Sequence, residues 1–209
     1  MQREIGWPIY VALALVLLCG AAWHDTGYAA SHLPGGEAQW RLTFEDDFDG
    51  ETLDLTKWRI LPSKSPVAPR VDAYWSREQT FVDGEGHLII QVDEVDGEYH
   101  AGAVDTKGNF EQAYGYYEAR VQLPTEEGFW TAFWLMTDGV LRVGDEGRDG
   151  TEIDIYEAPY ATEDRIHHAL HWDGYGEHHR VAGHNVLVPG IHQGFHTFAL
   201  EWNVDEYVF

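Results

Sequence analysis

The chain has 209 residues, of which 44% are hydrophobic and 14% aromatic, a composition that excludes a disordered chain and suits one globular domain. Thirteen basic against 36 acidic residues give a formal net charge of −23, which would repel nucleic acid and anionic membrane surfaces. A soluble surface accounts for this charge without a specific role, and neutral or cationic ligands are the natural partners.

An apolar segment, IYVALALVLLCGAA, follows Arg3 near the N-terminus and has small residues behind it. This pattern is typical of an export signal with cleavage after Ala22 or Ala29, so we expect residues 1–30 to be a signal peptide or an N-terminal anchor. The protein is therefore expected to be secreted or held in the cell envelope, periplasmic or extracellular. Cys19, the only cysteine, lies in this segment, so the mature domain would have no disulfide to form.

The remainder, residues 31–209, reads as short β-forming runs separated by turn-forming clusters of Gly, Pro and Asp. No stretch of ten or more residues has convincing helical periodicity. The predicted strands cover residues 87–92, 115–123, 129–136, 151–158, 165–172, 184–188 and 195–202. Many strands at short spacing indicate an all-β antiparallel sandwich or barrel.

Two tryptophans stand out in the run 129–136, because side chains in a strand alternate between faces with a period of two. Trp130 and Trp134 therefore share a face. They are either core residues, since tryptophan is highly buried on average, or flat platforms for sugar rings. The carboxylates of the following predicted strand favour the platform.

Those carboxylates lie in GTEIDIYEAP, residues 150–159, inside a β-forming apolar run where unpaired charge would be costly to bury. Glu152 and Asp154 are two residues apart and face the same side, whereas Glu157 should face the opposite one. A single β-bulge between them would absorb one residue and return Glu157 to the side of the other two. With such a bulge, the three acids would line one face of one strand.

Three explanations suit such a group of acids. Two carboxylates about 5 Å apart, one ionised and one protonated, perform retaining glycoside hydrolysis. A third acid nearby raises the pKa of its neighbours and can hold a shared proton. The alternatives are a calcium cluster and a solvated edge strand.

The segment EIDIYE resembles the E-x-D-x-x-E signature of glycoside hydrolase family 16, laminarinase-like type. Further segments resemble other blocks of that family, and they cover most of residues 40–202. These segments are FEDDFDGETLDLTKW (44–58), YGYYEARVQLP (114–124), GFWTAFWLM (128–136), ALHWDGYG (169–176) and FHTFALEW (195–202). The resemblance implies a jelly-roll β-sandwich of two curved antiparallel sheets with a substrate cleft.

The resemblance also implies residue roles in retaining hydrolysis of a β-linked polysaccharide. Glu152 would be the nucleophile, Glu157 the general acid/base and Asp154 the assisting acid between them. Trp130, Trp134 and His171 would contact sugar or the catalytic acids. No cofactor is expected, although a structural calcium is possible, and the twelve histidines, including the pairs at 167–168 and 178–179, match no zinc pattern.

Two features depart from the family pattern. Tyr156 stands where many laminarinase-like members have methionine, which weakens the assignment to β-1,3-glucan. The chain ends at NVDEYVF, where family members continue, so we expect the C-terminal strands of the sandwich to be missing.

The leading hypothesis is a secreted retaining endo-β-glycanase, most simply a β-1,3-glucanase, that works as a monomer on a polysaccharide. The first alternative is a hydrolase of a β-galactan such as agarose. A non-catalytic glycan-binding module would lack one or both glutamates, and a calcium-dependent adhesion domain would cluster its acids in loops.

Overall fold

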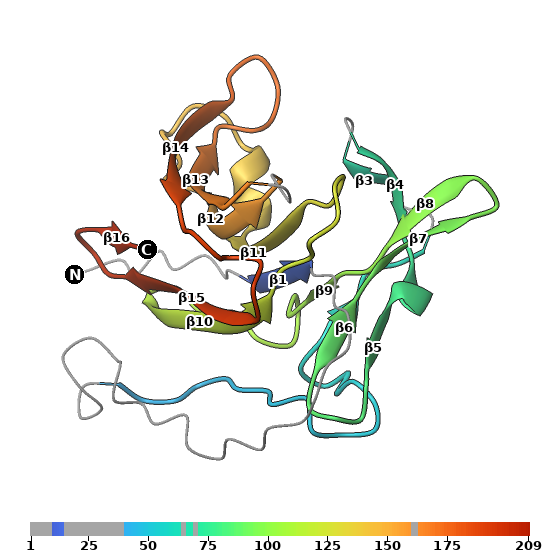
Figure 1. Cartoon of the computed structure of the whole chain (residues 1–209). Coiled ribbons are helices and arrows are strands. Elements are labelled where there is room, and N and C mark those ends of the chain that lie inside the picture. Colours follow the sequence, from blue (N-terminus) through green and yellow to red (C-terminus); the bar gives the residue numbers. More distant parts are fainter. Residues whose placement is uncertain (1–9, 15–39, 64–65, 69–70, 160–162) are drawn as a thin grey trace.

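The computed structural model describes residues 10–14, 40–63, 66–68, 71–159 and 163–209 (Figure 1). These residues form β-strands and two short 3-10 helices, η3 (Arg77–Gln79) and η4 (Asp138–Leu141). None of the helices in the described ranges is long and apolar enough to cross a membrane.

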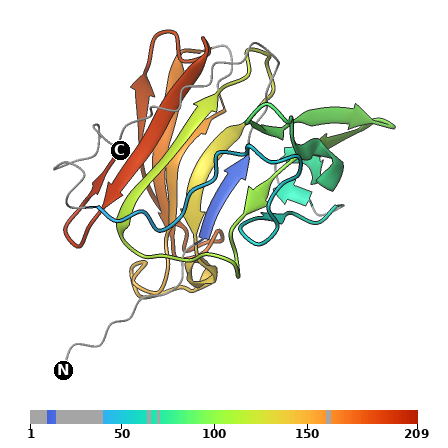
Figure 2. The ribbon, with the colours of Figure 1, turned by 90° about the horizontal axis from the view of Figure 1, so that it is seen from below.

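The largest sheet has seven strands in the order β14-β13-β12-β11-β1-β9-β2, and each neighbouring pair is antiparallel. Its strands are β1 (Tyr10–Ala14), β2 (Arg59–Ile60), β9 (Val104–Asp105), β11 (Thr131–Met136), β12 (Glu152–Ala158), β13 (Arg165–Trp172) and β14 (Arg180–Leu187). Figure 2 shows β1, in blue, lying between β11 and β9.

A three-stranded sheet packs on one face of the seven-stranded sheet (Figures 1 and 2). It consists of β10 (Gly115–Gln122), β15 (Phe195–Trp202) and β16 (Tyr207–Val208). Every second residue of β10 and β15 turns inward, as the period of two requires. The core between the two sheets includes Tyr117, Val121, Leu123, Phe133, Leu135, Ile153, Ile155, Tyr156, Ile166, Phe198 and Leu200. The sandwich architecture predicted from the strand pattern is confirmed.

Two smaller sheets extend the molecule beside β9. One has the order β3-β4-β8-β7 and contains a parallel pair, β4 with β8, which lies outside the two antiparallel sheets of the sandwich. The other pairs β5 with β6. Their strands are β3 (Pro66–Ala68), β4 (Val71–Trp75), β5 (Thr80–Val82), β6 (Leu88–Ile90), β7 (Val92–Val95) and β8 (Glu98–Ala101).

Strand β1 lies within the segment that the sequence predicts to be a signal peptide or anchor. It pairs with β11 along all of its residues, from Tyr10 opposite Met136 to Ala14 opposite Ala132, and it also pairs with β9. Cleavage after Ala22 or Ala29 would remove this strand and open the sheet between β11 and β9. The same residues can therefore serve either as a strand of the sheet or as part of a cleaved signal peptide, but not as both. The processing of residues 1–30 stays a prediction.

Candidate active site

A β-bulge in β12 puts the three predicted acids on one face. Across the pair with β11, Phe133 is opposite Tyr156 and Trp134 is opposite Asp154, which leaves Ile155 as the extra residue. Across the pair with β13 the register also shifts between Asp154 and Glu157. The predicted bulge is confirmed, and Glu157 returns to the side of Glu152 and Asp154. We call this side of the seven-stranded sheet the acid face.

The bulge also turns two successive residues of β12 into the core. Ile155 and Tyr156 are both fully buried, and the Tyr156 ring lies 4.0 Å from that of Phe198 on β15. Tyr156 therefore faces away from the acids. The Tyr156 side chain is part of the core packing and has no direct access to a substrate on the acid face.

The start of β12 is held by a close contact between two glycines. A Cβ atom on Gly139 of η4 would lie 1.7 Å from the backbone oxygen of Asp149, and one on Gly150 would lie 2.5 Å from the Gly139 carbonyl carbon. Gly150 also has a φ of +157°. Only glycine fits at either position, so this backbone contact fixes where Glu152 enters the sheet.

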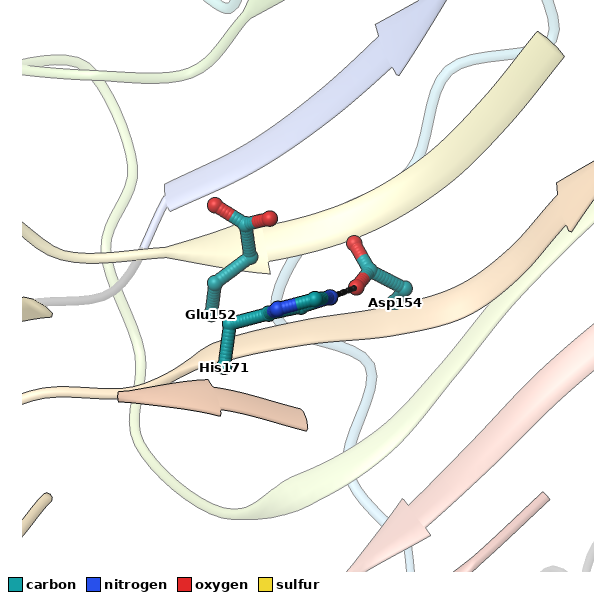
Figure 3. Close-up of side chains that lie close together, drawn as sticks. All are labelled: Glu152, Asp154 and His171. Atoms are coloured by element: carbon teal, nitrogen blue, oxygen red, sulfur yellow. Dashed lines mark ion pairs between the residues drawn. The ribbon is translucent and has the colours of Figure 1, made fainter. Parts of the chain in front are cut away.

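Each of the three acids has its own partner on the acid face. The Tyr175 hydroxyl donates a hydrogen bond to Oε2 of Glu152. Nε1 of Trp130 donates to Oε1 of Glu157 at 2.8 Å. Asp154 is only 3% exposed, and its Oδ2 lies 3.3 Å from Nε2 of His171, an ion-pair contact without good hydrogen-bond alignment (Figure 3).

His171 contacts a second histidine on its other side. Its Nδ1 lies 2.9 Å from Nε2 of His179, and the two rings stack with centroids 5.0 Å apart and planes inclined by 11°. His171 is also the cross-strand partner of Glu152. The imidazole is therefore held between a carboxylate and a second ring.

Burial and mutual repulsion raise the pKa of all three acids. Desolvation, with repulsion from Asp154, raises the pKa of Glu152 to about 7, although the Tyr175 hydrogen bond opposes the rise. Desolvation raises the pKa of Asp154 to about 6 against the contact with His171. Desolvation also raises the pKa of Glu157, opposed by the Trp130 hydrogen bond. The group therefore holds a proton near neutral pH, as acid catalysis requires.

One ligand-type atom from each of Glu152, Asp154 and His171 lies within 4.8 Å of the other two (Figure 3). This spacing alone would also suit a metal ion. However, Glu152 already accepts from Tyr175, and both ring nitrogens of His171 face protein partners. We therefore interpret the group as an acid–base cluster.

The two predicted tryptophans both lie outside the hydrophobic core. Trp130 is 55% exposed and is held at the acid face by its bond to Glu157. Trp134 is half-buried on the same face, directly opposite Asp154 across the strands. The core alternative weighed for this pair is therefore wrong for Trp130, whose ring surface is open to a ligand.

Tyr175 and His179 were missed by the sequence analysis. Both come from the turn between β13 and β14. Tyr175 lies in the segment ALHWDGYG, whose resemblance to a family block was already a signal. His179 belongs to the histidine pair at 178–179, whose spacing matches no zinc pattern and carries no other signal in the sequence.

Comparisons with known proteins point to one family. The model for Glycosyl hydrolases family 16 matches residues 68–209. A beta-glucanase from Rhodothermus marinus is 29% identical over 204 residues, which is 93% of this chain and 68% of that protein. Endo-1,3-1,4-beta-glycanase ExsH from Rhizobium meliloti is 29% identical over 155 residues, 73% of this chain, and the chain spans only 31% of ExsH.

Solved structures give the same picture. The laminarinase from Rhodothermus marinus superposes with a TM-score of 0.67 and 29% identity, covering 80% of this chain and 70% of that one. The laminarinase catalytic domain from Thermotoga maritima gives a TM-score of 0.65 and 26% identity, covering 80% and 72%.

Proposed function

The chain belongs to Glycosyl hydrolases family 16, and from this premise we propose that it cleaves a β-1,3-linked glucan internally with retention of anomeric configuration. The observation that carries the proposal is the bulge at Ile155, because it brings Glu157 to the same face as Glu152 and Asp154. Retaining hydrolysis uses two carboxyl groups on one face, one ionised as the nucleophile and one protonated as the acid, and the raised pKa of Glu157 suits the acid.

In the first step, an oxygen of ionised Glu152 attacks the anomeric carbon while the bond from that carbon to the leaving oxygen breaks. Glu157 gives its proton to the leaving oxygen. The Tyr175 hydroxyl favours the ionised form of Glu152, and Asp154 disfavours it by repulsion. The product is a glycosyl ester of Glu152 and a shortened chain with a free hydroxyl.

In the second step, Glu157 takes a proton from water, whose oxygen attacks the anomeric carbon and releases Glu152 as a carboxylate. The Trp130 indole donates to Glu157 and favours the ionised form that this step needs. Asp154 carries its charge between the two glutamates, balanced by His171. None of these steps requires a cofactor, and we propose that the reaction uses none.

The substrate class is supported by the names of the similar proteins, which include a beta-glucanase, an endo-1,3-1,4-beta-glycanase and laminarinases. The exposed ring of Trp130 is uncharged and lies on the acid face, so it suits a neutral sugar. The net charge of −23 disfavours anionic polysaccharides.

A panel of polysaccharides tests this proposal. Laminarin, mixed-linkage β-glucan and agarose would each be incubated with the full chain and assayed for new reducing ends, and the anomer of the first product would be read by NMR. We expect β-configured products from laminarin, and Glu127→Gln, an exposed loop variant, should retain this activity. Cleavage of agarose alone, or products of α configuration, would contradict the proposal.

Trp130 supplies a prediction about binding. Trp130→Ala should weaken glucan binding by about 1–3 kcal/mol, by analogy with base–aromatic stacking, because the exposed ring is lost as a platform. Isothermal titration with a laminarin oligosaccharide on the Glu152→Gln background would measure it. An unchanged affinity with a lowered melting temperature would show that the ring serves only packing.

We also propose that the protein is exported and acts as a monomer in the cell envelope or outside the cell. The apolar segment behind Arg3 supports export. N-terminal sequencing of the protein recovered from the cell envelope and the medium would test it, since an intact N-terminus in the recovered protein would contradict cleavage and leave β1 in place.

A further inference from the structure

The turn between β13 and β14, residues 173–179, folds back onto the acid face. Asp173 and Gly174 have φ angles of +59° and +74°, which reverse the chain direction just after β13 ends. The turn is tied to the segment after β11 by two hydrogen bonds, from Gly174 N to the Val140 oxygen at 2.7 Å and from Gly144 N to Oδ1 of Asp173 at 3.1 Å. The turn is therefore anchored to that segment by one backbone hydrogen bond and one bond to the Asp173 side chain.

Two side chains of this turn contact two different members of the acid–base cluster. Tyr175 donates its hydroxyl hydrogen to Glu152. His179 stacks on His171 with 2.9 Å between Nε2 and Nδ1, and its ring centroid lies 5.6 Å from that of Tyr175. Tyr175, His179 and His171 thus form a row of rings. The Tyr175 end contacts Glu152, and the His171 end contacts Asp154.

Resting on the proposed hydrolase function, we propose that Tyr175 and His179 are positioning residues for the reaction. Tyr175 orients the Glu152 carboxylate for attack, and His179 holds the His171 ring against Asp154.

The hydrogen-bonding capacity of imidazole explains why His179 is needed. A doubly protonated His171 pairs its charge with Asp154 on the Nε2 side and donates from Nδ1 to a neutral His179, so both contacts stabilise the charged ring. The titratable groups that face His171 are Glu152, Asp154 and Glu157 on β12, His167 on its own strand, and His179. Contact with Asp154 raises the pKa of His171, whereas partial burial, then repulsion from His171, lowers that of His179.

Two substitutions of His179 separate the acceptor atom from the ring. His179→Phe keeps a stacking ring and removes the nitrogen acceptor, whereas His179→Gln keeps an acceptor and removes the ring. His178→Gln is the matched control, because His178 is the exposed neighbour in the same turn. The readouts are the NMR titration of the His171 ring in the full chain, kcat and KM on laminarin, and the melting temperature.

We expect His179→Phe to lower the pKa of His171 and to reduce kcat roughly tenfold or more at nearly constant KM, since a misplaced catalytic group loses rate. His179→Gln should stay within about twofold of the parent because it still accepts the hydrogen bond. The inference is overturned if the His171 titration is the same in His179→Phe and in the parent, or if both variants lose activity equally.

Tyr175→Phe removes one hydroxyl and tests the other half of the inference. The hydroxyl favours ionised Glu152, so its loss should raise the pKa of Glu152 further and move the acidic limb of the kcat/KM profile upward by about half a pH unit. A lower melting temperature with an unmoved limb would reveal a merely structural tyrosine. If the parent cleaves no glucan, the proposed function fails, while the NMR titrations of His171 and Glu152 still decide this inference.

Discussion

Glu157→Ala and Glu152→Ala should both lose at least about a thousandfold in polysaccharide hydrolysis, but they should fail at different steps. Glu157→Ala keeps the nucleophile, so an aryl glucoside with a good leaving group should still form the glycosyl ester and then stall for want of a base. Glu152→Ala cannot form the ester from any substrate. A burst of released aryl alcohol, seen only with Glu157→Ala, would mark the difference.

Azide identifies the two residues by the stereochemistry of its product. It needs no base, so with Glu157→Ala it should attack the stalled ester and give the β-glycosyl azide with net retention. In the cavity left by Glu152→Ala it can only attack the substrate directly and give the α-azide. The anomer is read by NMR. An exchange of the two products between the variants would reverse the assignment of nucleophile and acid/base.

Neutralising Glu152 should stabilise the fold, and the gain should grow with pH. Burial raises the pKa of this carboxyl from its ordinary value of 4.5 to about 7. Below pH 4.5 the group is protonated in the folded and unfolded states and has no effect on stability. Between these values only the folded state keeps the proton, and above pH 7 the folded state bears the full penalty of a buried charge. The free energy of unfolding of the parent therefore falls as pH rises from 4.5 through 7.

The expected difference can be measured by thermal unfolding. The free energy of unfolding of Glu152→Gln should exceed that of the parent by about 1–2 kcal/mol more at pH 8 than at pH 5.5. This difference corresponds to roughly 2–8 °C in melting temperature. Glu127→Gln, on an exposed loop, is the control and should show no such dependence. An advantage that stays constant across this range would mean that Glu152 is not held in a desolvated, repulsive environment.

Strand parity indicated that only a bulge could bring the three acids to one face. Glu152, Asp154 and Glu157 cannot share a face of a regular strand, so the sequence itself contained the irregularity. The same rule put Trp130 and Trp134 together. These inferences succeeded because they concern neighbours along one strand, where covalent geometry determines the face.

Contacts between distant segments could not be anticipated in this way. Tyr175 reaches Glu152 and His179 reaches His171 from a turn in which Asp173 and Gly174 have positive φ angles and Gly174 is bonded to Val140. The parallel pairing of β4 with β8 and the insertion of β1 beside β11 likewise join segments far apart in sequence. Alternation within a run does not determine which runs become neighbours.

Both glutamates that we propose to react belong to one strand, β12, so the spacing of their Cα atoms is set within one stretch of peptide backbone. The pairing and the bulge of β12 hold that spacing, whereas Trp130 and Tyr175 reach the glutamates from other segments through side-chain contacts. Warming toward the melting temperature should therefore disorder the side chains that contact the glutamates before it changes the spacing of the two residues along β12. The relative placement of the two glutamates then depends on β12, while the rate of hydrolysis and the affinity for glucan depend on the side chains that other segments supply.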